Sequence, residues 1–206
     1  MVKRMFGKKL GMTRYFLGEG KCVPVTIVKV EPCIVVQKKT SENDGYEAIQ
    51  VGFGIEKENR LNKPMKGHFK KAGDRFFTHL REIRVNNVND FELGQEIKAD
   101  IFQIGETVNV AGRSKGRGFS GVIKRWGFSG GRKTHGSRSH KVPGSIGSSA
   151  TPSRVLKGKK MPGRFGYQRT TIKNLTVLDV RADQDIIALK GTLPGSQNSI
   201  IEIAKI

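Results

Sequence analysis

One glycine pattern in this sequence could in principle bind a nucleotide. Gly116-Arg-Gly-Phe-Ser-Gly121 fits the form G-x-G-x-x-G and follows a strand-like stretch at 107–111. A dinucleotide site of this kind also needs an acidic residue about twenty positions further on, to bind the ribose hydroxyl. No acidic residue occurs between Glu106 and Asp179, and basic residues surround the glycines. The sequence therefore argues against a nucleotide site.

The histidines and cysteines are too dispersed for a metal centre or a catalytic group. Only His135 and His140 lie close together, and Cys22 and Cys33 show no C-x-x-C spacing. A structural metal site needs clustered ligands, and an enzyme needs a base, a nucleophile or a metal in one pocket. A pair such as Ser137 with His135 arises easily by chance in a segment rich in both residue types. We expect no metal, no cofactor, no small-molecule substrate and no catalysis, and two buried free thiols in a reducing compartment.

Charge is distributed very unevenly along the chain. Lysine and arginine number 38 against 18 acidic residues, which gives a formal charge of +20. Residues 107–178 hold 16 of the basic residues and no acidic one, so the other 134 residues carry 22 basic and 18 acidic groups. Such a balance requires a polyanionic partner, either nucleic acid or an anionic membrane. No apolar run approaches the ~18 residues of a spanning helix, and residues 1–10 lack the apolar core of a secretory signal. Nucleic acid is the favoured partner.

Short stretches rich in β-branched residues flank the basic segment. Turn formers at 42–45 and 193–196 separate them, and such spacing predicts a mainly β fold of the closed or nearly closed barrel type, which leaves no exposed edges. One short helix is expected at 63–73, begun by Pro64 and ended by Gly73. The expected strands lie at 22–30, 34–37, 46–53, 95–102, 171–180, 185–189 and 199–203.

The basic middle segment, residues 113–168, is composed differently. Its 56 residues include 12 glycines, 14 basic residues and only 13 apolar ones. The entropy cost of ordering this backbone exceeds what so few apolar side chains can return, so the segment should not fold alone. We expect it to be mobile in the free protein and to become ordered against a partner that supplies negative charge. The predicted domains are a barrel formed by 1–112 with 169–206, and an internal extension at 113–168.

A flexible basic tail is the simplest alternative, but two features argue against it. The segment is internal, with strand-like sequence on both sides, and aromatic residues are interspersed among the cations. Aromatic rings stack on unpaired bases while arginine and lysine bind phosphates; Phe165 and Tyr167 could instead pack at the base of the loop. Glycine turns at 130–131, 143–147 and 162–163 would let the backbone pass close to RNA, and the cations at 157–160 suit several converging phosphates.

The residues expected to bind RNA are the basic side chains, the histidines and the tryptophan of this segment. Trp126 would stack on a base or act as a wedge, and the glycines would allow close passage. The full set is Arg113, Lys115, Arg117, Lys124, Arg125, Trp126, Arg132, Lys133, His135, Arg138, His140, Lys141, Arg154, Lys157, Lys159, Lys160 and Arg164.

Residues 102–125 contain a specific pattern formed by Phe102, Asn109, the run Gly112-Arg-Ser-Lys-Gly-Arg-Gly118, Gly121 and Arg125. This pattern resembles the signature of the ribosomal protein L3 family of the large subunit. Further similarity runs along nearly the whole chain, in the bacterial or organellar arrangement: 7–13, 44–50, 66–69, 80–84, 124–126, Ser137, 143–147, 151–152 and 157–161.

The resemblance implies a β-barrel of the translation-protein type with a long loop that runs toward the peptidyl transferase centre. It implies binding to 23S-type rRNA near its 3′ end, an early role in subunit assembly, and the neighbours L14 and L19. The expected location is the cytoplasmic ribosome, or an organelle's stroma or matrix. The loop tip would consist of Gly144, Ser145, Ile146, Gly147, Ser148, Ser149, Ala150, Thr151 and Pro152.

Two positions depart from the family pattern. Some bacterial members carry a methylated glutamine at the position of Ala150, and alanine has no amide to modify. Pro162 replaces the usual alanine and should stiffen its turn. Two other functions stay open at this point. An RNA chaperone would bind many RNAs alike, and an enzyme on a barrel scaffold would lose activity when His135 or His140 is changed.

Overall fold

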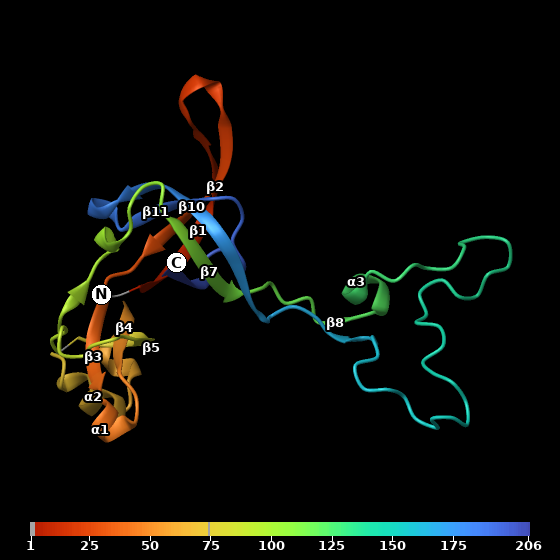
Figure 1. The fold of residues 1–206 in the computed structure, drawn as a ribbon, viewed down its shortest axis with the longest axis horizontal. Helices are drawn as coiled ribbons and strands as arrows, with labels where there is room; N and C mark the ends of the chain where they lie inside the picture. Colours follow the sequence, from red (N-terminus) through yellow and green to blue (C-terminus); the bar gives the residue numbers. More distant parts are fainter. Residues whose placement is uncertain (1–2, 74) are drawn as a thin grey trace. The chain divides into compact units, whose positions relative to one another are not determined.

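The computed structural model describes residues 3–73 and 75–206 and divides the chain into two compact units (Figure 1). The first unit comprises Met1–Arg113 together with Arg169–Ile206, and the second comprises Ser114–Gln168. The first unit contains a closed barrel and a second sheet, and the second unit is mostly irregular.

Six antiparallel strands close the barrel in the order β1-β12-β7-β10-β11-β2. Alternating apolar side chains from these strands point inward, because successive residues of a strand face opposite sides, and Val28, Val110, Ile187 and Ile203 are fully buried. Closure leaves the barrel no free edge over the paired lengths. The strands are β1 (Arg4–Phe16), β2 (Cys22–Val30), β7 (Thr107–Arg113), β10 (Arg169–Arg181), β11 (Ile186–Lys190) and β12 (Ile200–Lys205).

A four-stranded sheet in the order β5-β4-β3-β6 packs within the same unit. Its strands are β3 (Cys33–Lys39), β4 (Ala48–Ile55), β5 (Phe77–Arg84) and β6 (Glu96–Ile97). Sheet and barrel share one hydrophobic core, in which Phe6 of β1 stacks on Phe53 of β4 with ring centres 4.9 Å apart. The helices of the unit are α1 (Ser41–Asp44), α2 (Lys63–Lys70) and the short 3-10 turns η1 (Gly18–Gly20), η2 (Glu58–Arg60), η3 (Ala99–Ile101) and η4 (Ala182–Gln184).

The prediction of a mainly β fold with a closed barrel is confirmed. The expected helix is present as α2, which begins at Lys63 as predicted but ends at Lys70 and not at Gly73; the Asn62 side chain caps it by accepting a hydrogen bond from the Met65 N–H. Two expected strands, at 34–37 and 46–53, belong to the second sheet and not to the barrel. The strands β1 and β5 were not predicted, because glycines and charges obscure their alternation.

Two details of the expectation are wrong. The stretch 95–102 forms only the two-residue strand β6 and then the turn η3, because the chain must bend there to bury Ala99 and Phe102. Cys22 is exposed near the end of the β1–β2 hairpin, whereas Cys33 is buried as expected. Burial raises the pKa of the Cys33 thiol to about 11, which keeps it neutral and unreactive.

Candidate nucleic-acid interface

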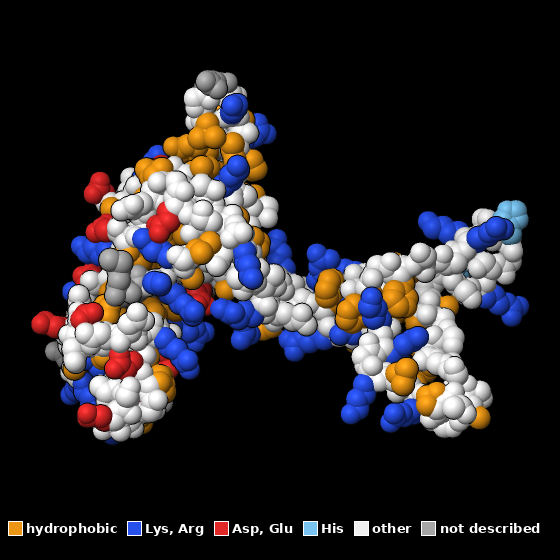
Figure 2. Space-filling view, in the orientation of Figure 1, with side chains coloured by type: hydrophobic (Ala, Val, Ile, Leu, Met, Phe, Trp, Pro, Cys, Tyr) orange, Lys and Arg blue, Asp and Glu red, His pale blue; other side chains and the backbone are white. Residues whose placement is uncertain are grey.

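The second unit exposes almost all of its positive charge. Residues 114–168 contain 13 basic side chains and no acidic one. All 13 are exposed except Arg125, which is half-buried, and Arg113 just outside the unit is exposed too. Lysine and arginine side chains stand out along this part of the surface in Figure 2. Since no carboxylate lies within the unit, its cations cannot be neutralised by ion pairs inside it.

The two ends of the unit are paired with each other, and we call residues 114–120 and 163–168 the neck. The Ser114 N–H donates to the Gln168 carbonyl at 2.9 Å, and the Arg117 N–H donates to the Phe165 carbonyl at the same distance. Strand β8 (Phe119–Ser120) then pairs with β9 (Gly163–Arg164). Gly166 has a φ of +76°, and a side chain there would collide with the Lys115 carbonyl. The neck is therefore a close backbone pairing that requires glycine.

Helix α3 (Val122–Trp126) follows the neck, and two of its side chains donate to one carbonyl of the returning chain. The Arg125 Nη1 donates to the Met161 carbonyl at 2.8 Å, and the Trp126 Nε1 donates to the same oxygen at 2.9 Å. The Arg125 guanidinium lies 4.9 Å from the centre of the Trp126 ring, and the Lys160 ammonium lies 5.8 Å from it. Two of the predicted RNA-binding residues, Arg125 and Trp126, thus have partners within the protein.

A hollow of about 560 Å³ lies beside Gly130 and Gly131. The Gly131 N–H donates to the Ser139 carbonyl at 3.0 Å, and a Cβ at Gly130 would lie 2.6 Å from the His140 carbonyl. These two glycines therefore allow two stretches of the protein's own backbone to meet. The hollow is lined by Ile123, Gly130, Gly131, Lys133, His140 and Lys141, so three side chains that can carry positive charge converge around it.

The farther stretch, residues 142–160, has little structure of its own. All of its residues are exposed, including the nine of the predicted tip. Its described hydrogen bonds join residues at most three apart: Ser145 to the Gly147 carbonyl, Ser153 to the Ala150 carbonyl, and the Lys159 N–H to Leu156. Such local bonds do not fix the path of a chain this long.

Aromatic rings lie beside cations in the neck. Phe119 is 81% exposed and Tyr167 is 54% exposed, so both offer faces on which a base could stack. The Arg164 guanidinium lies 5.8 Å from the Tyr167 ring centre, and that of Arg117 lies 5.2 Å from the ring centre of half-buried Phe165. The neck thus combines stacking surfaces with positive charge.

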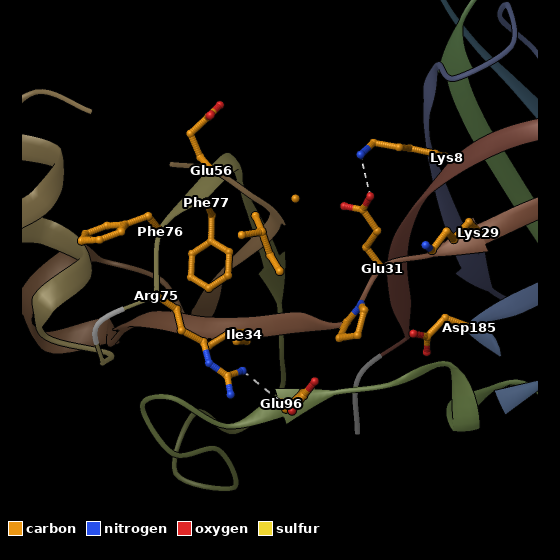
Figure 3. Close-up of a pocket in the computed structure, with 13 residues that line it drawn as sticks. Lys8, Lys29, Glu31, Ile34, Glu56, Arg75, Phe76, Phe77, Glu96 and Asp185 are labelled. Atoms are coloured by element: carbon orange, nitrogen blue, oxygen red, sulfur yellow. Dashed lines mark hydrogen bonds and ion pairs between the residues drawn. The ribbon is translucent and has the colours of Figure 1, made fainter. Parts of the chain in front are cut away.

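The first unit contains a pocket of about 630 Å³ that would be the natural place for an active site (Figure 3). Three of its carboxylates are paired with cations: Lys8 lies 2.5 Å from Glu31, Arg60 lies 3.3 Å from Glu56, and Arg75 lies 4.0 Å from Glu96. Among its described lining residues there is no histidine, cysteine or serine. Figure 3 shows the Lys8–Glu31 and Arg75–Glu96 pairs among apolar side chains.

The remaining predicted site residues lie on the surface of the second unit as separate side chains. Within residues 3–73 and 75–206, none of these side chains takes part in a hydrogen bond or an ion pair; they are Lys115, Lys124, Arg132, Lys133, His135, Arg138, Lys141, Arg154, Lys157 and Lys159. In the same described ranges no group of histidine, cysteine and acidic side chains could hold a metal ion. No helix there is long and apolar enough to cross a membrane.

Sequence reasoning missed the Met161 carbonyl, on which Arg125 and Trp126 converge. A backbone oxygen carries no signal in the residue types, so the spacing of Arg125 and Trp126 could not reveal this contact. The order of cations, aromatics and glycines in the sequence did indicate that the second unit has a surface of basic and aromatic side chains.

Comparison with known proteins gives a consistent result over the whole chain. The family model described as Ribosomal protein L3 matches residues 79–186. The large ribosomal subunit protein uL3 of Syntrophotalea carbinolica is 52% identical over 206 residues, covering 100% of this chain and 98% of the relative. The uL3 proteins of Geobacter sulfurreducens and Thermotoga maritima are 53% and 51% identical over 201 and 202 residues, each covering 98% of this chain and 96% of the relative.

Proposed function

Because the chain belongs to the ribosomal protein L3 family, and so is a non-enzymatic structural constituent of the large ribosomal subunit, we propose that residues 113–168 hold it in the rRNA. The bound RNA would be 23S-type rRNA near its 3′ end. The barrel, 1–112 with 169–206, would lie against the rRNA and neighbouring proteins, and the extension would be inserted between RNA segments.

The observation that carries the proposal is that the second unit exposes many basic side chains and contains no acidic residue. Thirteen basic side chains lie within 55 consecutive residues, and twelve of them are exposed. Phosphates are the anions that a ribosome supplies at that density, and their contacts with lysine and arginine release condensed counterions. The hollow beside Gly130, with Lys133, His140 and Lys141 around it, is well suited to receive one phosphate group.

The exposed tip at residues 144–152 supports a second part of the proposal. Its small residues and its lack of long-range contacts suit a segment whose path is set by surrounding RNA. We infer that this tip approaches the peptidyl transferase centre, as the family resemblance implies. Because Ala150 has no side-chain amide, any contribution of the tip there depends on backbone shape and not on a modified glutamine.

Assembly and protein contacts form the third part. A protein that becomes ordered only with RNA is most useful when it binds early, before the surrounding RNA closes around it. We propose an early assembly role and contacts of the barrel with L14 and L19, in the cytoplasmic ribosome.

The dependence of RNA affinity on salt tests the electrostatic mechanism. If about eight of the basic residues of 107–178 contact phosphate, the slope of log K against log salt should be roughly −6 to −7. The measurement uses the full chain and a transcript of the 3′-proximal domain of large-subunit rRNA. A slope near −2 would overturn the proposal. Equal affinity for an unrelated transcript of the same length would favour the RNA-chaperone alternative.

A further inference from the structure

We propose that Arg125 and Trp126 do not contact RNA, and instead form an internal latch that fixes the base of the RNA-binding extension. The latch consists of Arg125 and Trp126 on α3, together with the Met161 carbonyl and Lys160 on the returning chain. This inference rests on the proposed function, since it assigns roles within the segment that binds rRNA.

One donor nitrogen of Arg125 is committed to the protein. Its Nη1 donates to the Met161 carbonyl at 2.8 Å, and the side chain is half-buried. A Cβ at Gly163 would lie only 2.5 Å from this nitrogen, so Gly163 leaves the space that the guanidinium occupies. A phosphate that bound the Nη1 of Arg125 would therefore have to displace the hydrogen bond to Met161.

Trp126 is engaged at its polar edge and near its ring. The indole Nε1 donates to the Met161 carbonyl at 2.9 Å. The ring has the Arg125 guanidinium 4.9 Å and the Lys160 ammonium 5.8 Å from its centre, both in cation–π range. The Trp126 ring is 42% exposed, and a base that stacked on it would compete with these two cations, whereas Phe119, at 81% exposure, has no cation beside its ring among the described residues.

The latch closes a large loop. It joins Trp126 to Met161, so the 34 residues between them leave from and return to one fixed point. Together with the β8–β9 pairing of the neck, it sets where the two arms of the extension begin. Preorganising these starting points reduces the conformational entropy that RNA binding must overcome.

Lys124 offers a matched control on the same helix. It is exposed and its side chain has no partner among the described residues, while Arg125 beside it is half-buried and hydrogen-bonded. The two residues carry the same charge one position apart. Removing each charge therefore separates a phosphate contact from a latch contact.

The first experiment measures the salt slope for K124Q and R125Q in the full chain with the 3′-proximal rRNA transcript. K124Q should make the slope shallower by about 0.7–0.9, the value for one lost phosphate contact. R125Q should leave the slope unchanged and weaken binding by a similar factor at every salt concentration. A loss of slope in R125Q equal to that in K124Q would overturn the latch. A wild-type slope near −2 would instead overturn the proposed function.

The second experiment uses the fluorescence of Trp126, the single tryptophan of the chain. In the free protein, acrylamide should quench Trp126 more strongly in R125Q than in wild type or K124Q, because the latch is then weakened. Adding rRNA should change the wild-type emission little. Strong quenching by rRNA, with equal acrylamide quenching in all three free proteins, would show that Trp126 stacks on a base. The thermal transition of the barrel checks that each variant is folded.

Discussion

The two units of this protein differ in how their positive charges are neutralised. The barrel unit holds all 18 acidic residues of the chain and pairs many of them, as Glu202 is paired with both Arg4 and Arg169. The second unit has no acidic residue and leaves nearly all of its cations exposed. The barrel unit therefore offsets most of its own positive charge, and the extension needs an external anion.

The two units also differ in how many apolar side chains they bury. Among the described residues, the barrel unit buries a continuous apolar core that includes Met5, Phe53 and Ile203, whereas Val122 is the only buried apolar residue of Ser114–Gln168. Hydrophobic burial is the main favourable contribution to folding. We therefore expect the barrel to fold independently and the extension to become ordered only on its partner. Each prediction below tests one side of this contrast.

Removing the extension should have the largest effect. Replacing residues 114–168 by Asn-Gly joins Arg113 to Arg169, which are already Cα partners in the β7–β10 pair, through a two-residue hairpin turn. The variant should retain a cooperative thermal transition, since the core lies in the barrel unit. Its affinity for the rRNA transcript should fall by on the order of a thousandfold or more, with a much shallower salt slope.

Calorimetry and the salt titration together check this result. A shuffled extension of the same composition is the matched control: it restores charge without the neck or the latch, so it should recover salt-dependent binding but not the specificity for the cognate transcript. Loss of the cooperative transition in the deletion variant would show that the extension is part of the core.

Truncating the core should affect the barrel and leave the extension's charge intact. Phe53 is 2% exposed and stacks on Phe6, so F53A should destabilise the protein by about 3–5 kcal/mol. Ile55, two residues further along β4, is 94% exposed, and I55A should change stability by less than about 0.5 kcal/mol. Urea unfolding gives both values. At temperatures where F53A is still folded its salt slope should match wild type, and a shallower slope would contradict the separation of the two roles.

The contrast also explains which features could be predicted from sequence. The barrel strands β2, β10, β11 and β12 were evident because β-branched residues run along them, and their burial in a closed barrel follows from that pattern. The division of the β-stretches between barrel and second sheet was not evident, because pairing partners such as Val51 and Arg81 are far apart in sequence and both sheets use the same residue types.

For the candidate site, sequence identified the residue types but not their partners. The exposed cations of 113–168 follow from composition, since a segment with so few apolar residues cannot bury its charges. The different situation of Arg125 and Lys124 could not be predicted, because it depends on whether the returning chain brings the Met161 carbonyl within reach. Two neighbouring basic residues can therefore differ in role when only one of them reaches a backbone carbonyl that is distant in the sequence.

Acid should weaken the barrel and spare the extension, and this is the smallest of the expected effects. The Tyr46 hydroxyl, 2.9 Å from Glu82, and Lys39 hold the pKa of that carboxyl below its usual 4.5. Burial would raise the pKa of Glu106, but the Lys205 ammonium and the Gln103 N–H outweigh it, so this pKa is lowered too. Because the folded-state pKa values lie below the unfolded ones, these carboxylates stabilise the fold above pH 4.5. That contribution is lost as the pH falls through the folded-state values.

The thermal midpoint of the full chain should therefore fall as the pH is lowered from 5 to 3.5, and E106Q should reduce this dependence. E42Q is the control, since Glu42 is exposed in α1 and has no ion pair among the described residues. The extension has no carboxylate to protonate, so its binding to inorganic polyphosphate, whose internal phosphates stay ionised, should not weaken over the same range. A fall in both the thermal midpoint and the polyphosphate affinity over this pH range would contradict the contrast. It would show that anion binding by the extension depends on the carboxylates of the barrel unit.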